Sequence, residues 1–224
     1  VKDIVATVVF LFVFFLIVFY LPEMGGYFLE HANFVPANPI VTPEHIAPVW
    51  YFTPFYSILR AIPPLFGSQF PGVLVMGLSI LVLFFLPWID RNPIKSIRYR
   101  SPVHAINLTV FPIAFVVLGW LGTQPANAPL LAELAVRFTE IYFLFFFVLW
   151  AHSRDRSLVF GVVSFLVLLG AITLYDLTRL GGDNVPLVLG GWLIPAAYLT
   201  VVLLLPVFTS LSREKPVPAR AGAA

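Results

Sequence analysis

Proton-exchanging and aromatic side chains gather in residues 44–56 of the sequence. Glu44 and His45 come first, and the stretch HIAPVWYFTPFY then places Trp50 and Tyr51 among further aromatic residues. A carboxylate or an imidazole can exchange protons near neutral pH, and aromatic rings can line a pocket for a flat, apolar ligand. This combination is compatible with proton-coupled chemistry on such a ligand.

The same residues also have structural interpretations. Thr42 and Pro43 are typical of a helix start, where Glu44 would simply favour the helix dipole. Aromatic residues such as Trp50 are common where a protein meets the membrane interface. A second ionisable pair, Lys2 and Asp3, heads the first apolar run, and such a pair usually anchors a span at the interface.

Composition places the chain among membrane proteins. Hydrophobic residues make up 60% and charged residues 11% of the 224 residues, and the mean hydropathy is +0.95. Runs of about 20 apolar residues can cross a bilayer as helices. Six such spans are predicted, at residues 4–21, 72–89, 103–121, 134–151, 158–177 and 187–208. The predicted fold is therefore an all-α, polytopic transmembrane helical bundle.

The distribution of Lys and Arg predicts the orientation of the bundle. Ten of the 13 basic residues flank one set of span ends and three flank the other. By the positive-inside rule both termini and the loop DRNPIKSIRYR are predicted to be cytoplasmic. The basic residues flank spans and form no continuous stripe, so nucleic-acid binding is not expected.

The loop at residues 22–71 is expected to be an ordered extracytoplasmic cap. It is longer than usual connections, yet it carries too much aromatic material for a solvated linker. Two short helices are predicted within it, one beginning near Thr42 and an amphipathic one at residues 54–61. In the second, Phe55, Ile58 and Leu59 share an apolar face, and Arg60 points to water or to a partner.

Several ordered motifs together resemble the C-terminal half of cytochrome b, the membrane subunit of quinol-oxidising cytochrome bc complexes. They are KD at the head of the first span, VTPEHIAPVWYFTPFYSILRAIP, LPWIDR and LGWLG. The resemblance covers residues 1–152. Residues 153–210 look like an added transmembrane hairpin, in which Asp176, Arg179 and Asp183 fall at the outer turn, and residues 211–224 look like a flexible cytoplasmic tail.

The resemblance implies two quinone pockets. Pro48, Val49, Trp50, Tyr51 and Phe52 match the border of the quinol-oxidation pocket, where the family carries Pro-Glu-Trp-Tyr and this chain has Pro-Val-Trp-Tyr. The lysine and aspartate that match Lys2 and Asp3 belong to the quinone-reduction pocket on the opposite side.

Val49 cannot accept a proton, although quinol oxidation releases two. The candidates for this task within the loop are Glu44, His45, Tyr51 and an ordered water molecule. Of these, the imidazole of His45 has the ordinary pKa closest to neutral pH.

Haem and iron–sulfur centres are expected on partners. The four histidines do not lie at depth on facing spans, so b-type haems have no expected ligands here, and there is no cysteine. The resemblance implies as partners the N-terminal haem-binding half of cytochrome b, a Rieske iron–sulfur protein and a cytochrome c1-type subunit, in a dimeric complex within the lipid bilayer. The N-terminal half would be a separate polypeptide or a missing portion of this one.

The function implied is the quinone-site portion of a proton-translocating quinol:cytochrome c oxidoreductase. Its ligand would be ubiquinone or another quinone, and the chain would not be catalytic alone. The alternative from another class is a non-redox membrane scaffold or a transporter subunit. Transport would need ionisable residues along a pathway within spans, and here Glu140 is the nearest to such a residue.

Overall fold

The computed structural model describes residues 2–24, 34–41, 46–64, 67–125, 128–154, 158–179 and 185–216. The fold is all-α, as predicted, and the chain divides into two compact units, Val1–Thr53 and Pro54–Ala224. The helix predicted to begin near Thr42 lies outside the described residues.

The first unit contains helix α1, Lys2–Tyr20, and residues 46–53 of the cap. Phe, Leu, Ile and Val make up most of α1, so the helix is apolar on every face. Its rings stack one turn apart, with centroid distances of 6.3 Å for Phe10 and Phe14 and 5.8 Å for Phe15 and Phe19. This helix matches the first predicted span.

Helix α2, Thr53–Ala61, confirms the amphipathic helix predicted in the cap. Ile58 is fully buried, and the Phe55 ring meets that of Phe115 at a centroid distance of 5.7 Å. Arg60, for which water or a partner was expected, donates to the Gln124 carbonyl at 3.0 Å and lies over the Tyr56 ring. The apolar face of α2 therefore joins the helical core.

The remaining helices follow the predicted spans closely. They are α3 (Phe70–Phe84), α4 (Leu86–Ile89), α5 (Pro102–Gly122), α6 (Pro129–Arg154), α7 (Leu158–Arg179), α8 (Val185–Gly191), α9 (Leu193–Leu199), the π-helical turn Thr200–Leu204 and α10 (Leu205–Phe208). In the described part of the chain, five helical segments are long and apolar enough to cross a membrane. The span predicted at 72–89 is broken into two helices. Helix α3 ends at Phe84, and α4 begins at Leu86 with Pro87 in its first turn.

Aromatic packing joins α5 to α6. The Phe111 ring lies 4.2 Å from that of Phe145 and 5.3 Å from that of Tyr142, measured between centroids. The Tyr142 hydroxyl donates to the Ser79 carbonyl of α3 at 2.8 Å, so α3 is held to the same pair. These contacts form the core of the part that resembles cytochrome b.

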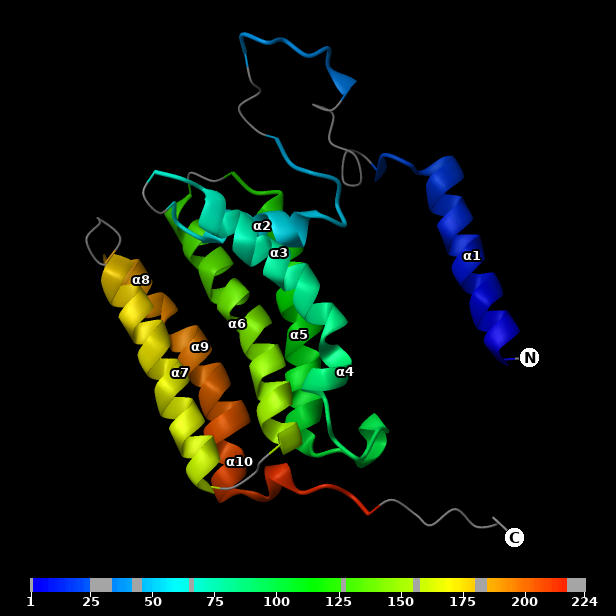
Figure 1. Cartoon of the computed structure of the whole chain (residues 1–224). Coiled ribbons are helices and arrows are strands. Elements are labelled where there is room, and N and C mark those ends of the chain that lie inside the picture. The colour runs from blue at the N-terminus through cyan, green and yellow to red at the C-terminus, as the bar shows by residue number, and fades with distance from the viewer. Residues whose placement is uncertain are drawn as a thin grey trace. The chain divides into compact units, whose positions relative to one another are not determined.

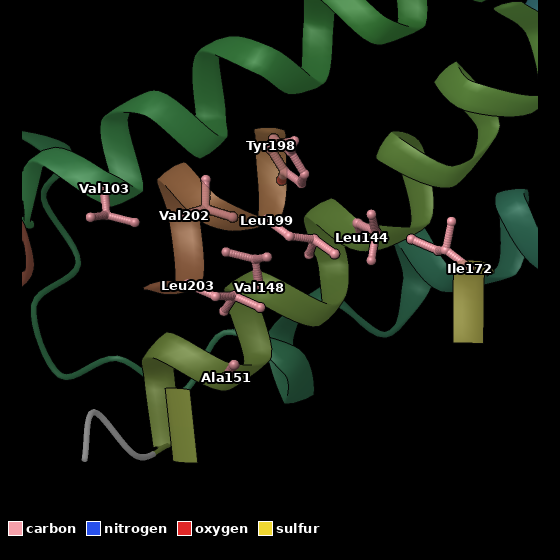
Figure 2. Packing of buried hydrophobic residues seen from close by; sticks show 9 residues of the cluster. All are labelled: Val103, Leu144, Val148, Ala151, Ile172, Tyr198, Leu199, Val202 and Leu203. Carbon is pink, nitrogen blue, oxygen red and sulfur yellow. The ribbon is translucent and has the colours of Figure 1, made fainter. Parts of the chain in front are cut away.

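The helices of the predicted added hairpin pack into this bundle. Figure 2 shows Val103 of α5, Val148 of α6 and Leu199 of α9 in one buried cluster. The Tyr198 hydroxyl donates to Asn107 Oδ1, and Asn107 Nδ2 donates to the Phe145 carbonyl at 3.3 Å. Residues of α5, α6 and α9 thus share one hydrogen-bonded junction inside the bundle.

Three segments predicted to be cytoplasmic meet at one end of the second unit (Figure 1). They are the end of α6, the loop at residues 90–100 and the segment after α10. Ser153 Oγ, near the end of α6, donates to the Ile89 carbonyl at 2.9 Å, and Lys215 N donates to the Tyr99 carbonyl at 2.9 Å. The loop at residues 90–100 and the segment after α10 therefore lie at the same end, as the Lys and Arg distribution requires.

Candidate functional site

An apolar pocket of about 640 Å³ lies within the first unit. Its wall comes from the C-terminal half of α1 and from the cap. The lining residues are Phe10, Val13, Phe14, Ile17, Val18, Pro22, Val49, Trp50 and Tyr51. Residues 27 to 41 positions apart in the sequence thus line one cavity, and aromatic rings stand on both of its sides.

A tight turn presents the cap residues to the pocket. Phe52 N donates to the Val49 carbonyl at 2.8 Å, and Thr53 Oγ1 at the start of α2 donates to the Trp50 carbonyl at 2.7 Å. The Trp50 and Tyr51 rings pack edge to face, with centroids 5.8 Å apart and an interplanar angle of 86°. About half of each of these side chains remains exposed, so both can contact a ligand.

Three of the predicted quinol-pocket residues line this cavity, and two flank it. Val49, Trp50 and Tyr51 are in the wall, whereas Pro48 and Phe52 stand beside it in the chain without lining it. Glu44 and His45 lie outside the described residues. Among the described lining residues, the only polar side-chain groups are the Trp50 indole N–H and the Tyr51 hydroxyl, and position 49 contributes a valine where the family motif has glutamate.

Lys2 and Asp3 lie at the opposite end of α1 from the pocket. Phe10, the first residue of α1 that lines the pocket, comes eight residues after Lys2, or about 12 Å along the helix at 1.5 Å per residue. Both side chains are exposed, and the Asp3 carbonyl accepts a bond from Thr7 Oγ1 at 2.9 Å. The two predicted quinone sites therefore fall at the two ends of one helix.

The sequence prediction missed a buried cluster of charges between α6 and α7. Arg137, fully buried, donates through Nε to Glu133 at 2.6 Å, through Nη1 to both oxygens of Glu140 at 3.2 Å and through Nη2 to Asp176 at 2.9 Å. Arg179 Nη2 donates to the other oxygen of Glu133 at 2.6 Å. Five ionisable residues thus occupy apolar helices, where only Glu140 was expected to approach such a position.

Asp176 and Arg179 belong to the last turns of α7, whereas they were expected at an outer turn. Asp183 lies outside the described residues. The spacing of Glu133, Arg137 and Glu140 at i, i+4 and i+7 already places them on one helix face. That signal could have identified three of the five residues of the cluster, but nothing in the sequence indicates that Asp176 meets them.

The described residues do not fit a bis-histidine haem. His104 lies near the start of α5, where its Nε2 is 3.2 Å from Arg100 Nη1, and His152 Nδ1 is hydrogen-bonded to the Val148 carbonyl at 2.9 Å. Both lie at the same end of the bundle, outside its middle. The described residues also contain no group of three or more His, Cys, Asp or Glu arranged to hold a metal ion.

Comparison with known proteins places the matched region in one family. Residues 36–144 match the family model described as Cytochrome b(C-terminal)/b6/petD. Cytochrome b of Allochromatium vinosum is 54% identical over 155 residues, which is 68% of this chain and 37% of the relative. Cytochrome b of Rhodospirillum rubrum is 45% identical over 151 residues, 66% of this chain and 35% of the relative.

A solved structure shares the fold. A chain of a structure named "Hyperthermophilic respiratory Complex III" aligns with a TM-score of 0.57 and 38% identity over 68% of this chain and 36% of that chain. This chain therefore spans about a third of the length of the relatives it matches. Residues 36–144 form the C-terminal domain of a cytochrome b, and through this domain the chain belongs to the cytochrome b family.

Proposed function

We propose that the chain supplies the quinone-site portion of cytochrome b in a proton-translocating quinol:cytochrome c oxidoreductase. The observation that carries the proposal is the pocket of about 640 Å³ between α1 and the turn at Val49, Trp50 and Tyr51. An apolar cavity with two edge-to-face rings suits a flat quinone head group with an apolar tail. Family membership supports the same assignment.

In this proposal the side chains bind and orient the quinol. Phe10 and Phe14 line the α1 side of the pocket, and Trp50 and Tyr51 line the cap side. Of the described wall residues, Tyr51 offers a hydroxyl that can bond to a quinol oxygen. Because the Val49 side chain has no polar atom, the proton leaves through another acceptor of the loop, for which Glu44, His45, Tyr51 and an ordered water molecule remain the candidates.

The electron acceptors would lie on partners. A Rieske iron–sulfur protein would take one electron from the quinol, and b-type haem would take the other. The described histidines do not fit haem ligation, so no step is assigned to haem in this chain. The N-terminal half of cytochrome b and a cytochrome c1-type subunit complete the proposed dimeric complex in the bacterial inner membrane, with both termini of this chain in the cytoplasm.

The charge cluster gives no support to a transporter. Its three carboxylates and two guanidinium groups bond to one another and to the Val188 carbonyl. A transport pathway would instead present such groups to a water-filled channel. The cluster is therefore better explained as a joint between α6, α7 and α8.

The proposal is tested on the assembly purified through a tag on this chain. We expect a b-type haem band in the reduced-minus-oxidised spectrum and decylubiquinol:cytochrome c reductase activity. Trp50→Ala should lower kcat/KM at least tenfold, while Trp120→Ala on the exposed face of α5 should leave it unchanged. If no haem accompanies the intact chain, or if both variants behave alike, the scaffold interpretation is favoured.

A further inference from the structure

A second cavity, of about 580 Å³, lies within the second unit at the end where Ser153 meets Ile89. Its inner wall is apolar and includes Leu83, Leu86, Leu108 and Phe111. Its rim carries Asp90, Lys95, Arg100 and His104. The cavity thus joins a hydrocarbon-like interior to a polar mouth, and it shares no residue with the pocket at Trp50.

The rim is positively charged and partly fixed in position. Arg100 is 7% exposed, and it donates to Asp90 Oδ2 at 2.6 Å and to the Ile94 carbonyl at 2.7 Å. Asp90 therefore balances Arg100. Lys95 is exposed, and none of the ion pairs in the described part of the chain involves it. The mouth is left with one uncompensated cation.

The surrounding loop strengthens this positive field. Residues 90–100 contain four basic residues, Arg91, Lys95, Arg98 and Arg100, against the single acid Asp90. The loop is held in place, because Asn92 Nδ2 donates to Glu214 at 2.8 Å and Lys215 N donates to the Tyr99 carbonyl. It connects α4 with α5, so it lies at the depth of lipid head groups when the helices span a bilayer.

We propose that this cavity binds one anionic phospholipid, with its phosphate near Lys95 and an acyl chain along Leu83, Leu86 and Leu108. A basic recess between spanning helices is complementary to an anionic head group, and a basic residue near the membrane surface favours such lipids. A neutral amphiphile would satisfy the apolar wall and leave the charge of Lys95 unused. A free phosphate would satisfy Lys95 and leave the apolar wall without a partner.

The first experiment measures lipid binding to the purified assembly that contains the full chain. Native mass spectrometry with dioleoylphosphatidylglycerol and dioleoylphosphatidylcholine gives the dissociation constant for each. We expect one phosphatidylglycerol molecule to bind more tightly than phosphatidylcholine. Lys95→Glu should raise the dissociation constant of phosphatidylglycerol about tenfold or more, because it reverses a charge at the rim. Arg98→Glu, an equal change in the same loop outside the cavity lining, should raise it far less.

A second pair of variants tests the apolar wall. Leu83→Trp narrows the cavity, whereas Leu81→Trp changes an exposed position on the same helix α3 that does not line it. Only the first should lower phosphatidylglycerol binding, and glycerol phosphate should not compete. Equal binding of both lipids, equal effects of Lys95→Glu and Arg98→Glu, or equal effects of the two tryptophan variants would overturn the proposal. Full competition by glycerol phosphate would overturn it in favour of a free phosphate.

Discussion

Arg137 of α6 donates from Nη2 to Oδ1 of Asp176 on α7 at 2.9 Å, and it does so while fully buried. The bond joins a helix of the cytochrome b domain, residues 36–144, to a helix that lies beyond it. The same guanidinium binds Glu133, Glu140 and the Val188 carbonyl of α8. Arg137 is therefore the centre of the charged contact between the family domain and the additional helices.

Replacing Arg137 by Met should destabilise the fold strongly. The change leaves the buried carboxylates of Glu133 and Asp176 and the partly buried one of Glu140 with only Arg179 to balance them, and removing one partner of a buried ion pair costs about 3–5 kcal/mol. For a chain of this size we expect the melting temperature in detergent to fall by roughly 10 °C. Tryptophan fluorescence during heating would measure this temperature. Arg98→Met, at an exposed position, is the control and should melt within about 2 °C of the wild type. Equal melting of the two variants would contradict the assigned role of Arg137.

We predict that the fold requires glycine at position 191, because a side chain there would collide with the charge cluster. A Cβ placed there would lie 2.7 Å from Glu133 Oε1 and 2.8 Å from Arg137 Nε, whereas a Cβ at Gly190 would meet nothing within 4 Å. Gly191→Ala should therefore cost about 1–3 kcal/mol by pushing the charge cluster apart. Gly190→Ala should be neutral or slightly stabilising, since alanine favours a helix. Thermal melting of the two variants side by side would test the close approach, and an equal effect would refute it.

The hydrogen bond between Tyr198 and Asn107 gives a third stability prediction. Tyr198→Phe keeps the ring but removes the hydroxyl that donates to the buried Asn107 Oδ1. A buried acceptor left unpaired costs about 1–3 kcal/mol, so the melting temperature should fall by several degrees. Tyr20→Phe removes a hydroxyl from an exposed side chain of α1 and should have no such effect. An unchanged melting temperature for Tyr198→Phe would show that the bond contributes nothing measurable.

The missing carboxylate at position 49 leads to a rescue experiment. If His45 accepts the quinol proton, His45→Ala should lower kcat by about 100-fold, the low end of what a positioned general base contributes. Val49 lines the pocket, so Val49→Glu in the His45→Ala background would place a carboxylate there and should restore much of the lost rate.

Glu44→Gln, tested in the same way, separates the two candidates. The measurement is the rate of quinol oxidation against pH in the purified assembly. Unchanged rates and pH profiles for both His45→Ala and Glu44→Gln would exclude either side chain as the proton acceptor.

The spans and the amphipathic helix α2 could be predicted from the sequence because each depends on a local pattern. Runs of apolar residues mark α1, α5 and α7, and the helical spacing of Phe55 and Ile58 marks α2. The break in the predicted span at 72–89 was missed, although Pro87 was visible, because proline often persists within membrane helices. In the described residues the result is five long helical segments and one shorter, interrupted one.

Contacts between distant residues could not be predicted in this way. The motif residues Trp50 and Tyr51 were identifiable, but their approach to Phe10 and Phe14 depends on how the chain returns to α1. Likewise, the Glu133 and Arg137 pair follows from helix spacing, whereas the arrival of Asp176 depends on the packing of α7. Pairings of this kind are set by tertiary structure, on which a single sequence carries little signal.

The central claim is that the pocket at Val49, Trp50 and Tyr51 binds quinone, and photolabelling tests it most directly. Membranes containing the assembly would be irradiated with a photoactivatable azidoquinone, with and without excess decylubiquinol, and the labelled peptides identified by mass spectrometry. We predict label within residues 10–22 and 49–51 that the excess quinol removes and Trp50→Ala reduces. Label found only elsewhere in the chain, or label in this pocket that decylubiquinol does not displace, would contradict the claim.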